Sequence, residues 1–316
     1  MFTSSRPLGR AENVSAVWDK CPFDKEFALI SPTGECDGAE TAGERGFDVI
    51  VTDEFLQKVD KPRVGVVMIG HGIDGMKLYG LDQRTRYFTQ DQTSQIDWYV
   101  TGSEHTRSFC STAAGIPLER CVALGMPRTD AYVGKRKGDG GTLMAGYARA
   151  YLYAPTLRAG WEPPAPDIDW AMVDSQLSDD EVLVVKRHMV MRSPITTGGY
   201  RHIVEVPPSE PSTPYLVDCD VVISDYSSIV LDGYVLGKPS VLFCPDAEGY
   251  CNVRGFYREF PKCYTDRPVH DQLQIVRTAR AACGDGASAA RFRERYANMC
   301  DGHSSERVID LVRSMR

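Results

Sequence analysis

The sequence predicts an α/β protein whose strands form parallel sheets. Short apolar runs such as residues 64–69 (VGVVMI) are continuous rather than alternating, which is typical of strands buried on both faces of a sheet. Residues 219–246 have the pattern of a strand, a hydroxyl-rich turn, a helix and a second strand, which together make a βαβ unit. With 316 residues, the chain is long enough for two domains that each have their own core.

Composition argues against several classes of protein. The net charge of −7 argues against a protein held to nucleic acid by many phosphate contacts. No apolar run approaches the roughly 18 residues of a membrane-spanning helix, and residues 1–25 are polar and lack the core of a signal peptide. The ten cysteines are never spaced as CxxC, which favours reduced thiols over a zinc site or a disulfide framework. We therefore expect a cytoplasmic protein with no metal site.

One cluster of arginines has two interpretations. Its members are Arg277, Arg280, Arg291, Arg293 and Arg295. They form either a solvated helix face or a site for an anionic lipid or polymer, and the sequence leaves both open.

The first half of the chain places a histidine at the end of a strand. Apolar strands are expected at residues 27–31, 48–52 and 64–69, and the third runs directly into Gly70, His71 and Gly72. A residue just beyond the carboxyl end of such a strand lies where open α/β sheets bind ligands, and glycines let a substrate approach the backbone. His71 is therefore a candidate catalytic residue. The pattern continues with a strand and helix cap at 96–103, a helix at 104–114 and a strand at 120–124.

A linker divides the predicted domains. Residues 134–141 (GKRKGDGG) are charged and rich in glycine, so we expect a first domain at 1–140 and a second at 141–316, with the last helix packing back on the first. Asp218 and Asp220 spell an Asp-x-Asp metal motif, but they precede their strand and so lie at the wrong end of the sheet for a site. The second domain is expected to have strands at 150–154, 181–186, 221–223 and 240–243, and helices at 227–236, 271–282, 287–299 and 304–314.

The turn at residues 224–228 (SDYSS) has the chemistry of a phosphate site. The first turn of the helix that follows offers unpaired N–H groups and the positive end of the helix dipole. Ser227 and Ser228 add hydroxyl donors. The alternative is that Ser224, Asp225 and Ser227 only cap the helix.

Several separate blocks, in the same order, resemble the CDP-glycerol glycerophosphotransferases, which make teichoic acids and related capsule polymers. The resemblance covers roughly residues 48–265 and implies a GT-B architecture: two Rossmann-like parallel-sheet domains with a cleft between them, the acceptor on the first and the nucleotide donor on the second. The blocks are HGIDGMKLYG from His71, GMPRTD from Gly125, YAPTLR from Tyr153, KRH from Lys186, SDYSS from Ser224 with Asp232 beyond it, GKPSVLF from Gly237 and RGFY from Arg254.

The resemblance implies roles for individual residues. His71 would be the general base that takes the proton of the acceptor hydroxyl, a role suited to a group that titrates near neutrality. His188, when protonated, would donate to the pyrophosphate of the donor. Gly72, Asp74 and Lys77 would lie on the acceptor side. The donor side would comprise Arg128, Thr156, Arg158, Ser224, Asp225, Ser227, Ser228 and Asp232, with the two aspartates orienting His188 or the turn, or binding hydroxyl groups of glycerol or ribose.

The function implied is transfer of glycerol phosphate, or another polyol phosphate, from a CDP-linked donor to a polymer or lipid-linked acceptor, with release of CMP. A GT-B glycosyltransferase that uses a nucleotide sugar on a glycan or modified nucleobase is the alternative. It stays open because the His-Gly block has an extra residue, Met189 replaces the family's proline after His188, and the N-terminal half is compact. A non-catalytic nucleotide-binding module is a third interpretation. No cofactor is required by these motifs, a role for Mg²⁺ stays open, and contact with the inner face of the membrane is a family expectation.

Overall fold

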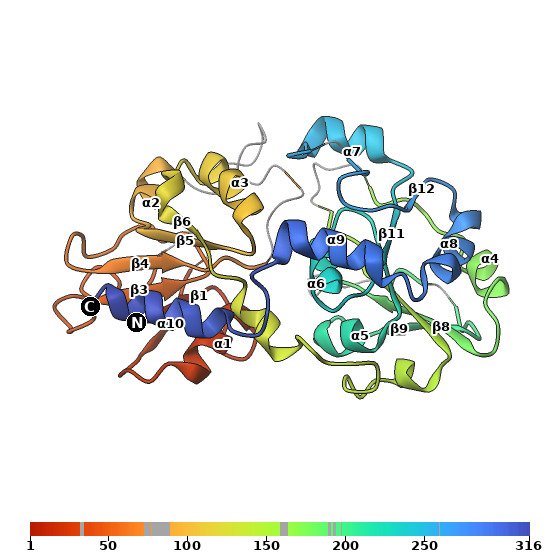
Figure 1. The fold of residues 1–316 in the computed structure, drawn as a ribbon, viewed down its shortest axis with the longest axis horizontal. Coiled ribbons are helices and arrows are strands. Elements are labelled where there is room, and N and C mark those ends of the chain that lie inside the picture. The colour runs from red at the N-terminus through yellow and green to blue at the C-terminus, as the bar shows by residue number, and fades with distance from the viewer. Residues whose placement is uncertain are drawn as a thin grey trace. The chain divides into compact units, whose positions relative to one another are not determined.

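The computed structural model describes residues 1–31, 35–72, 77, 89–158, 164–188, 191, 194–196, 198–258 and 260–316. The chain forms two compact units, Met1–Val133 with Glu294–Arg316, and Gly134–Arg293 (Figure 1). Each unit contains a six-stranded sheet in which every neighbouring pair of strands is parallel. The predicted pair of parallel-sheet α/β domains is therefore confirmed.

The sheet of the first unit has the strand order β2-β1-β3-β4-β5-β6. Its strands are β1 (Phe2–Ser4), β2 (Phe27–Leu29), β3 (Val49–Thr52), β4 (Gly65–Met68), β5 (Trp98–Thr101) and β6 (Cys121–Ala123). The order reverses between β1 and β3, and open sheets of this kind bind ligands at the carboxyl ends of the strands beside that reversal. Neither β1 nor helix α1 (Glu12–Lys20) was expected from the sequence, and the three residues of β1 are too few to show a period.

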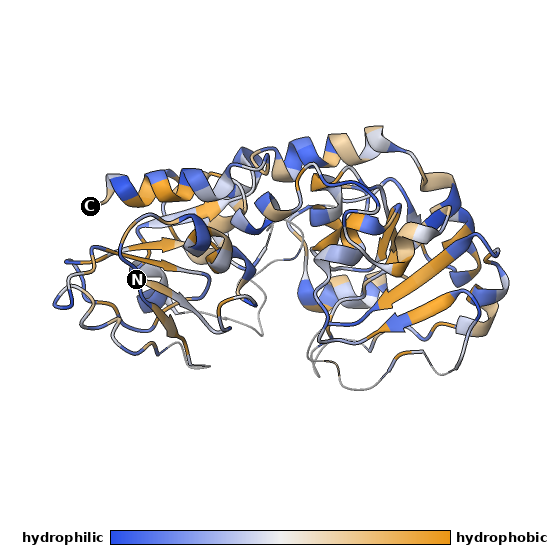
Figure 2. Ribbon diagram, turned by 90° about the horizontal axis from the view of Figure 1, so that it is seen from below, coloured by the Kyte–Doolittle hydropathy of each residue, from blue (hydrophilic) through white to orange (hydrophobic). Residues whose placement is uncertain are grey.

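Both faces of this sheet are buried. Val49 and Val51 of β3 pack with α1 and with α10 (Ser304–Ser314), whereas Ile50 packs in a separate cluster that includes Cys110 of α3 (Glu104–Ala114). Alternate residues of one strand thus enter opposite cores, which explains why its sequence is continuously apolar. Figure 2 shows the strands as largely apolar and α10 as a helix with both apolar and polar residues. The remaining helical segments are α2 (Gln90–Ser94), η1 (Leu118–Arg120) and η2 (Pro127–Ala131).

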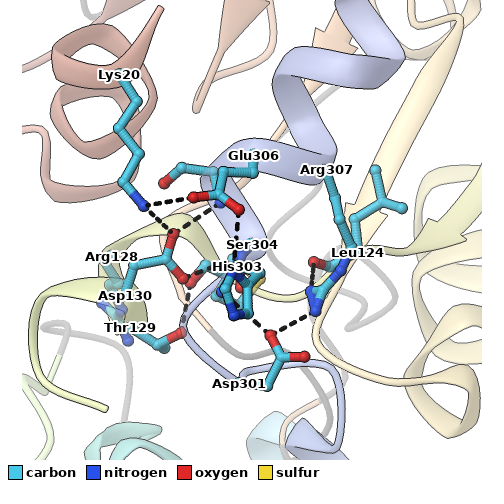
Figure 3. A network of polar contacts seen from close by, with 12 residues as sticks. Lys20, Leu124, Arg128, Thr129, Asp130, Asp301, His303, Ser304, Glu306 and Arg307 are labelled. Carbon is cyan, nitrogen blue, oxygen red and sulfur yellow. Dashed lines mark hydrogen bonds and ion pairs between the residues drawn. The ribbon is translucent and has the colours of Figure 1, made fainter.

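The last helix is attached to the first unit by polar contacts as well as by its apolar face (Figure 3). Asp130 of η2 accepts hydrogen bonds from the backbone N–H groups of Ser304 (3.0 Å) and Ser305 (2.8 Å), at the start of α10. Its carboxylate satisfies N–H groups that have no partner within the helix. Arg307 Nη1 donates to the carbonyl oxygens of Leu124 and Met299, each at 3.0 Å.

The sheet of the second unit has the order β12-β11-β10-β7-β8-β9. Its strands are β7 (Arg149–Tyr153), β8 (Glu181–Lys186), β9 (Ile203–Val206), β10 (Val221–Ser224), β11 (Ser240–Phe243) and β12 (Pro268–Val269). The order reverses between β7 and β10. The helical segments are η3 (Leu143–Gly146), α4 (Trp170–Ser175), α5 (Thr213–Asp218), α6 (Ile229–Val235), α7 (Ala247–Arg254), η4 (Gln272–Gln274), α8 (Ile275–Ala282) and α9 (Gly286–Ala297). Of these elements, β9, β12, η3, α5 and α7 were not expected.

The linker belongs to the second unit because one carboxylate holds it there. Asp218 is fully buried and accepts from the N–H groups of Gly138 (2.8 Å), Gly140 (2.9 Å) and Thr142 (2.8 Å), and from Thr142 Oγ1 (2.8 Å). Asp220 accepts from Lys137 Nζ at 2.6 Å. The compact units accordingly divide after Val133, and residues 294–316 belong to the first unit.

Three members of the arginine cluster are engaged within the protein. Arg280 pairs with the buried carboxylate of Glu181, and Arg291 pairs with Asp266. Arg295 Nε donates to His105 Nε2 at 3.1 Å. These contacts weaken the case for a polymer or lipid site on this cluster. Separately, none of the helices in the described ranges combines the length and the apolar character needed to cross a bilayer.

The contacts of Asp218 generate a stability prediction. Replacing Asp218 by Ala leaves buried N–H groups without partners, so we expect the second unit to lose about 2–4 kcal/mol of its free energy of unfolding, measured by urea titration. Burial acts to raise the pKa of Asp218, but its hydrogen bonds outweigh that effect and hold the pKa below its usual value. The contribution is therefore present above the unfolded-state pKa, about 3.9, and is lost as pH falls below it. The control, Asp179→Ala, removes a surface carboxylate whose side chain is 71% exposed and should change stability little. An equal effect of the two substitutions contradicts the prediction.

Candidate active site

Each sheet has a cluster of polar side chains at the carboxyl ends of the strands where its order reverses. In the first unit this cluster is centred on His71, which follows β4. Gly70 precedes it with a φ of 58°, a left-handed conformation that glycine adopts without strain. The side chain of His71 is 36% exposed. The predicted position of His71 beyond a strand end is thus what the structure has.

Two carboxylates that follow β3 flank the imidazole of His71. Nε2 lies 3.0 Å from Glu54 Oε1, and Nδ1 lies 3.7 Å from Asp53 Oδ2. The end of β1 contributes hydroxyl groups to both acids: Ser4 Oγ donates to Asp53 at 3.0 Å and Ser5 Oγ donates to Glu54 at 2.6 Å. Three neighbouring strand ends, β1, β3 and β4, therefore converge on one histidine.

The charged forms of His71 and Glu54 stabilise each other. Burial acts to lower the pKa of His71, but the hydrogen bond and charge of Glu54, followed by the charge of Asp53, raise it above its usual value. For Glu54, burial acts to raise the pKa and the interaction with His71 outweighs it, so the pKa is lowered. Asp53 is only 4% exposed, and burial holds its pKa above the usual value in spite of His71 and Ser4. Glu54 is thus the partner that carries negative charge most readily.

Arg128 lies beside His71, in the first unit, although the sequence grouped it with the donor-binding residues. Its Nη1 donates to the carbonyl oxygen of His71 at 2.8 Å, and its backbone N–H donates to Asn13 Oδ1 at 2.9 Å. Asn13 Nδ2 in turn donates to the carbonyl oxygen of Gly70 at 2.9 Å. A Cβ on Gly72 would lie 2.9 Å from Arg128 Nη2, so this glycine makes room for the arginine. Asp74 lies outside the described residues, and Lys77 is half-buried.

In the second unit, Asp225 joins the two strands at the reversal. It follows β10, and its Oδ1 accepts from the N–H of Tyr226 (2.6 Å) and from the N–H of Thr156 (2.7 Å), which lies beyond β7. Its Oδ2 lies 3.1 Å from Arg158 Nη2. Asp225 therefore fixes the relative position of the YAPTLR and SDYSS blocks.

Arg158 is held by protein groups. Its side chain is 8% exposed, and Nη1 lies 3.0 Å from Asp246 Oδ2. Its guanidinium stands 4.4 Å from the ring centroid of Tyr250, which stacks on Tyr226 with centroids 3.8 Å apart. Tyr226 Oη also donates to Asp246, at 2.8 Å. These contacts give Arg158 a role in holding the turn, and its assignment as a direct ligand of the donor stays a prediction.

The hydroxyl groups of the predicted donor site differ in availability. Ser224 Oγ is buried and donates to the carbonyl oxygen of Ala154 at 2.6 Å. Ser227 and Ser228 are half-buried, and α6 begins after them, at Ile229, without a side-chain cap from Ser228. Thr156 is 8% exposed, and its Oγ1 is buried without a hydrogen-bond partner in the described parts of the chain. Thr156 therefore offers a hydroxyl that the described part of the fold does not use.

The helix-cap interpretation of this turn finds little support. Ser227 Oγ accepts from the N–H of Ile229 at 3.4 Å, a long contact, while Ser224 and Asp225 bond to other segments. Asp232 is buried on α6.

His188 is half-buried and follows β8, the neighbour of β7. The residue before it, Arg187, pairs with Glu205 of β9, and Arg187 Nη1 donates to the carbonyl oxygen of Met191 at 3.0 Å. Glu205 also accepts from the N–H of Thr196 at 2.8 Å. The backbone on both sides of His188 is thereby held to the sheet.

Sequence reasoning missed Asp53, Glu54 and Ser4. The rule that selected His71, a polar residue directly after a buried strand, applies equally to Asp53 and Glu54 after the strand expected at 48–52. Ser4 carried no such signal, because β1 was not recognised. No group of three or more His, Cys, Asp or Glu side chains arranged to hold a metal ion occurs among the residues that the structure describes.

Known proteins with similar sequences share one activity class. The family model for CDP-glycerol:poly(glycerophosphate) glycerophosphotransferase matches residues 44–314. The teichoic acid glycerol-phosphate primase of Bacillus subtilis is 22% identical over 282 residues, which cover 84% of this chain and 74% of the relative. The teichoic acid ribitol-phosphate primase of Bacillus spizizenii is 28% identical over 235 residues, which cover 70% of this chain and 60% of the relative.

Solved structures agree on the fold. The wall teichoic acid polymerase TagF matches with a TM-score of 0.75 at 16% identity, over 99% of this chain and 88% of that chain. A UDP-GlcNAc 2-epimerase from Neisseria meningitidis matches with a TM-score of 0.63 at 11% identity, over 99% of both chains. The fold is thus GT-B-like. Because the family model spans most of the sequence, the chain belongs to the CDP-glycerol:poly(glycerophosphate) glycerophosphotransferase family, a family of transferases.

Proposed function

We propose that this protein transfers a polyol phosphate, glycerol phosphate or ribitol phosphate, from a CDP-linked donor to a hydroxyl group of a teichoic-acid-like polymer or lipid-linked acceptor. The observation that carries the proposal is the placement of His71 at a strand end beside the reversal of the first sheet, paired with a carboxylate, in a chain that the family model matches over residues 44–314. The family match favours this reaction over nucleotide-sugar transfer, which the sequence left open.

The first unit supplies the base. In the proposed step, His71 takes the proton of the acceptor hydroxyl while that oxygen forms a bond to the β-phosphorus of the donor. The bond from this phosphorus to the bridging oxygen of the pyrophosphate breaks, and CMP leaves with the electron pair. Arg128 and Asn13 hold the backbone at His71, which limits the geometries that its ring can adopt, and Gly72 leaves room for Arg128.

The second unit supplies the donor-side contacts. Thr156 Oγ1 and the hydroxyl groups of Ser227 and Ser228 are proposed to donate to pyrophosphate oxygens, and His188 in its protonated form adds a positive charge. Arg158 acts indirectly: its ion pairs with Asp225 and Asp246 hold the turn that carries the hydroxyl groups. Fixed donors of this kind stabilise the charge that develops on the leaving group, because they need no reorganisation during the reaction.

A donor screen tests the proposal. The purified protein is incubated with CDP-glycerol, CDP-ribitol, and UDP-, GDP- and dTDP-sugars, with Mg²⁺ or with EDTA, and the released nucleotide is identified. Release of CMP from a CDP-polyol supports the proposal, and the two metal conditions decide whether Mg²⁺ contributes. Release of a nucleoside diphosphate from a sugar donor, with no turnover of either CDP-polyol, contradicts it. Action on the cytoplasmic side, in peripheral contact with the membrane, completes the proposal, and a vesicle co-sedimentation assay checks it.

The base assignment predicts the effect of removing His71. We expect His71→Ala to lower kcat by roughly 10²- to 10⁴-fold while the Kd of the donor stays unchanged. A base must be neutral, and the neighbouring carboxylates raise the pKa of His71 above 6.5, so wild-type kcat/KM should fall as pH drops through that raised pKa. His303→Ala is the control, because this histidine is 66% exposed on the same unit and should leave kcat intact. A full rate in His71→Ala rules out the assignment.

The unpaired hydroxyl of Thr156 predicts that its removal weakens binding of the donor without lowering the stability of the protein. Thr156→Val removes Oγ1 but keeps the shape of the side chain, and this atom makes no hydrogen bond within the described chain. Thermal stability should therefore stay the same or rise slightly, while affinity for the CDP-linked donor falls about 10-fold or more, the loss of one hydrogen bond to a charged group. Thr156→Ser, which keeps the hydroxyl, should bind the donor nearly as wild type does. Equal donor Kd values for the Val and Ser variants, measured by calorimetry, disprove this contact.

A further inference from the structure

The two ring nitrogens of His71 have different neighbours, and we infer different roles for them from this difference. We propose that Glu54 is the positioning residue of His71: it accepts a hydrogen bond from Nε2–H and so leaves the lone pair of Nδ1 as the atom that takes the proton. The proposal deepens the transfer reaction proposed above and rests on it, but the state of the ring can be measured without that reaction.

The two distances support this division. A separation of 3.0 Å between Nε2 and Glu54 Oε1 is that of a hydrogen bond, whereas 3.7 Å between Nδ1 and Asp53 Oδ2 is too long for one. A neutral imidazole carries one N–H and one lone pair, and the N–H goes to the nitrogen that has the better acceptor. That nitrogen is Nε2. The lone pair of Nδ1 is then available to an acceptor hydroxyl, because none of the described residues forms a hydrogen bond with it.

Glu54 is itself fixed, as a positioning residue must be. Ser5 Oγ donates to the same oxygen that contacts His71, at 2.6 Å. The backbone of Glu54 is held by Thr52, whose Oγ1 accepts from the N–H of Glu54 at 3.1 Å and donates to its carbonyl oxygen at 2.8 Å. Thr52 is the last residue of β3 and is buried. The carboxylate is thus supported from β3 and from β1, on the two sides of the strand reversal.

Asp53 stabilises the ring of His71 after Nδ1 has taken the proton of the acceptor. The charged groups that face His71 are Asp53 and Glu54 from the end of β3 and Arg6 from beyond β1, while Arg128 of η2 contacts its carbonyl oxygen. When Nδ1 takes the proton, the resulting imidazolium lies between two carboxylates. Ser4 Oγ already holds Asp53 Oδ2, the oxygen that faces Nδ1. The positive ring is therefore stabilised on both sides, and the proton returns to solvent from a ring that is 36% exposed.

Part of this support comes from outside the family match. Ser4, Ser5 and Asn13 precede residue 44, where the match begins, yet they hold Asp53, Glu54 and the backbone of His71 and Arg128. The strand reversal between β1 and β3 requires β1, so the supporting hydroxyl groups are supplied by the strand that completes the sheet. The site of the first unit is thus assembled from matched and unmatched parts of the chain.

The test compares Glu54→Gln with Glu104→Gln, a control in which the glutamate is 66% exposed on α3. Loss of a residue that orients a catalytic histidine is expected to lower kcat roughly 10- to 100-fold. KM for the donor should stay within about twofold, because Glu54 does not contact the donor in this scheme. The acid limb of the kcat/KM profile should move to lower pH, since the amide no longer stabilises the protonated ring. Glu104→Gln should leave all three quantities as in wild type.

A spectroscopic measurement separates the proposal from the reaction. Two-dimensional ¹⁵N–¹H spectra of histidine-labelled full-length protein report which ring nitrogen carries the hydrogen, and His71→Gln identifies the signal of His71. We expect the Nε2–H tautomer in neutral wild-type His71 and a mixture of tautomers in Glu54→Gln. An Nδ1–H tautomer in the wild type, or an unchanged kcat and acid limb in a folded Glu54→Gln protein, overturns the proposal. If no CDP-polyol is turned over at all, the function proposed above fails while the tautomer still decides the role of Glu54.

Discussion

Both sheets of this protein are buried on two faces, and that constraint determines where chemistry can occur. A strand such as β3 sends alternate side chains into opposite cores, so it has no face left for polar residues. In such strands the polar groups lie mainly at the ends. At the carboxyl ends they meet where the strand order reverses, because neighbouring connections there leave the sheet in opposite directions. The carboxylates and hydroxyl groups of the candidate site occupy these positions in each unit, and His71 and His188 follow the next strand, β4 and β8.

Buried carboxylates recur as the means by which distant segments are held together. Asp218 holds a glycine-rich loop, Asp130 holds the start of α10, and Asp225 joins the ends of β7 and β10. In each case the acid accepts hydrogen bonds from backbone N–H groups, which have fixed positions and need no second side chain. Burying a carboxylate without such partners would cost free energy. These aspartates therefore depend on the backbone segments that they hold in place. Thr156 Oγ1 differs from these carboxylates, because it is buried without a hydrogen-bond partner among the described residues.

The sequence was sufficient for the fold class, for most strands of both sheets and for the placement of His71, because apolar runs and the residues that follow them are local features. It was not sufficient to identify which side chains form hydrogen bonds or ion pairs with one another. Ser4 and Asp53 are 49 residues apart, and Thr156 and Asp225 are 69 apart, so no local pattern relates them. Arg158 illustrates the same limit: its position in a block predicted a contact with the donor but did not reveal the two aspartates that folding brings to it. Short elements such as β1 also escape detection, since their stability comes from neighbours in the sheet.

The attachment of α10 to the first unit has a consequence for synthesis on the ribosome. Residues 294–316 complete a unit whose other residues, 1–133, emerge long before them. During translation the second unit can bury its core as soon as its strands are out, while the first unit still exposes the apolar surface that Val308 and Ile309 will cover. Residues 1–133 are therefore synthesised before the second unit but complete their fold after it, when residues 294–316 have been made.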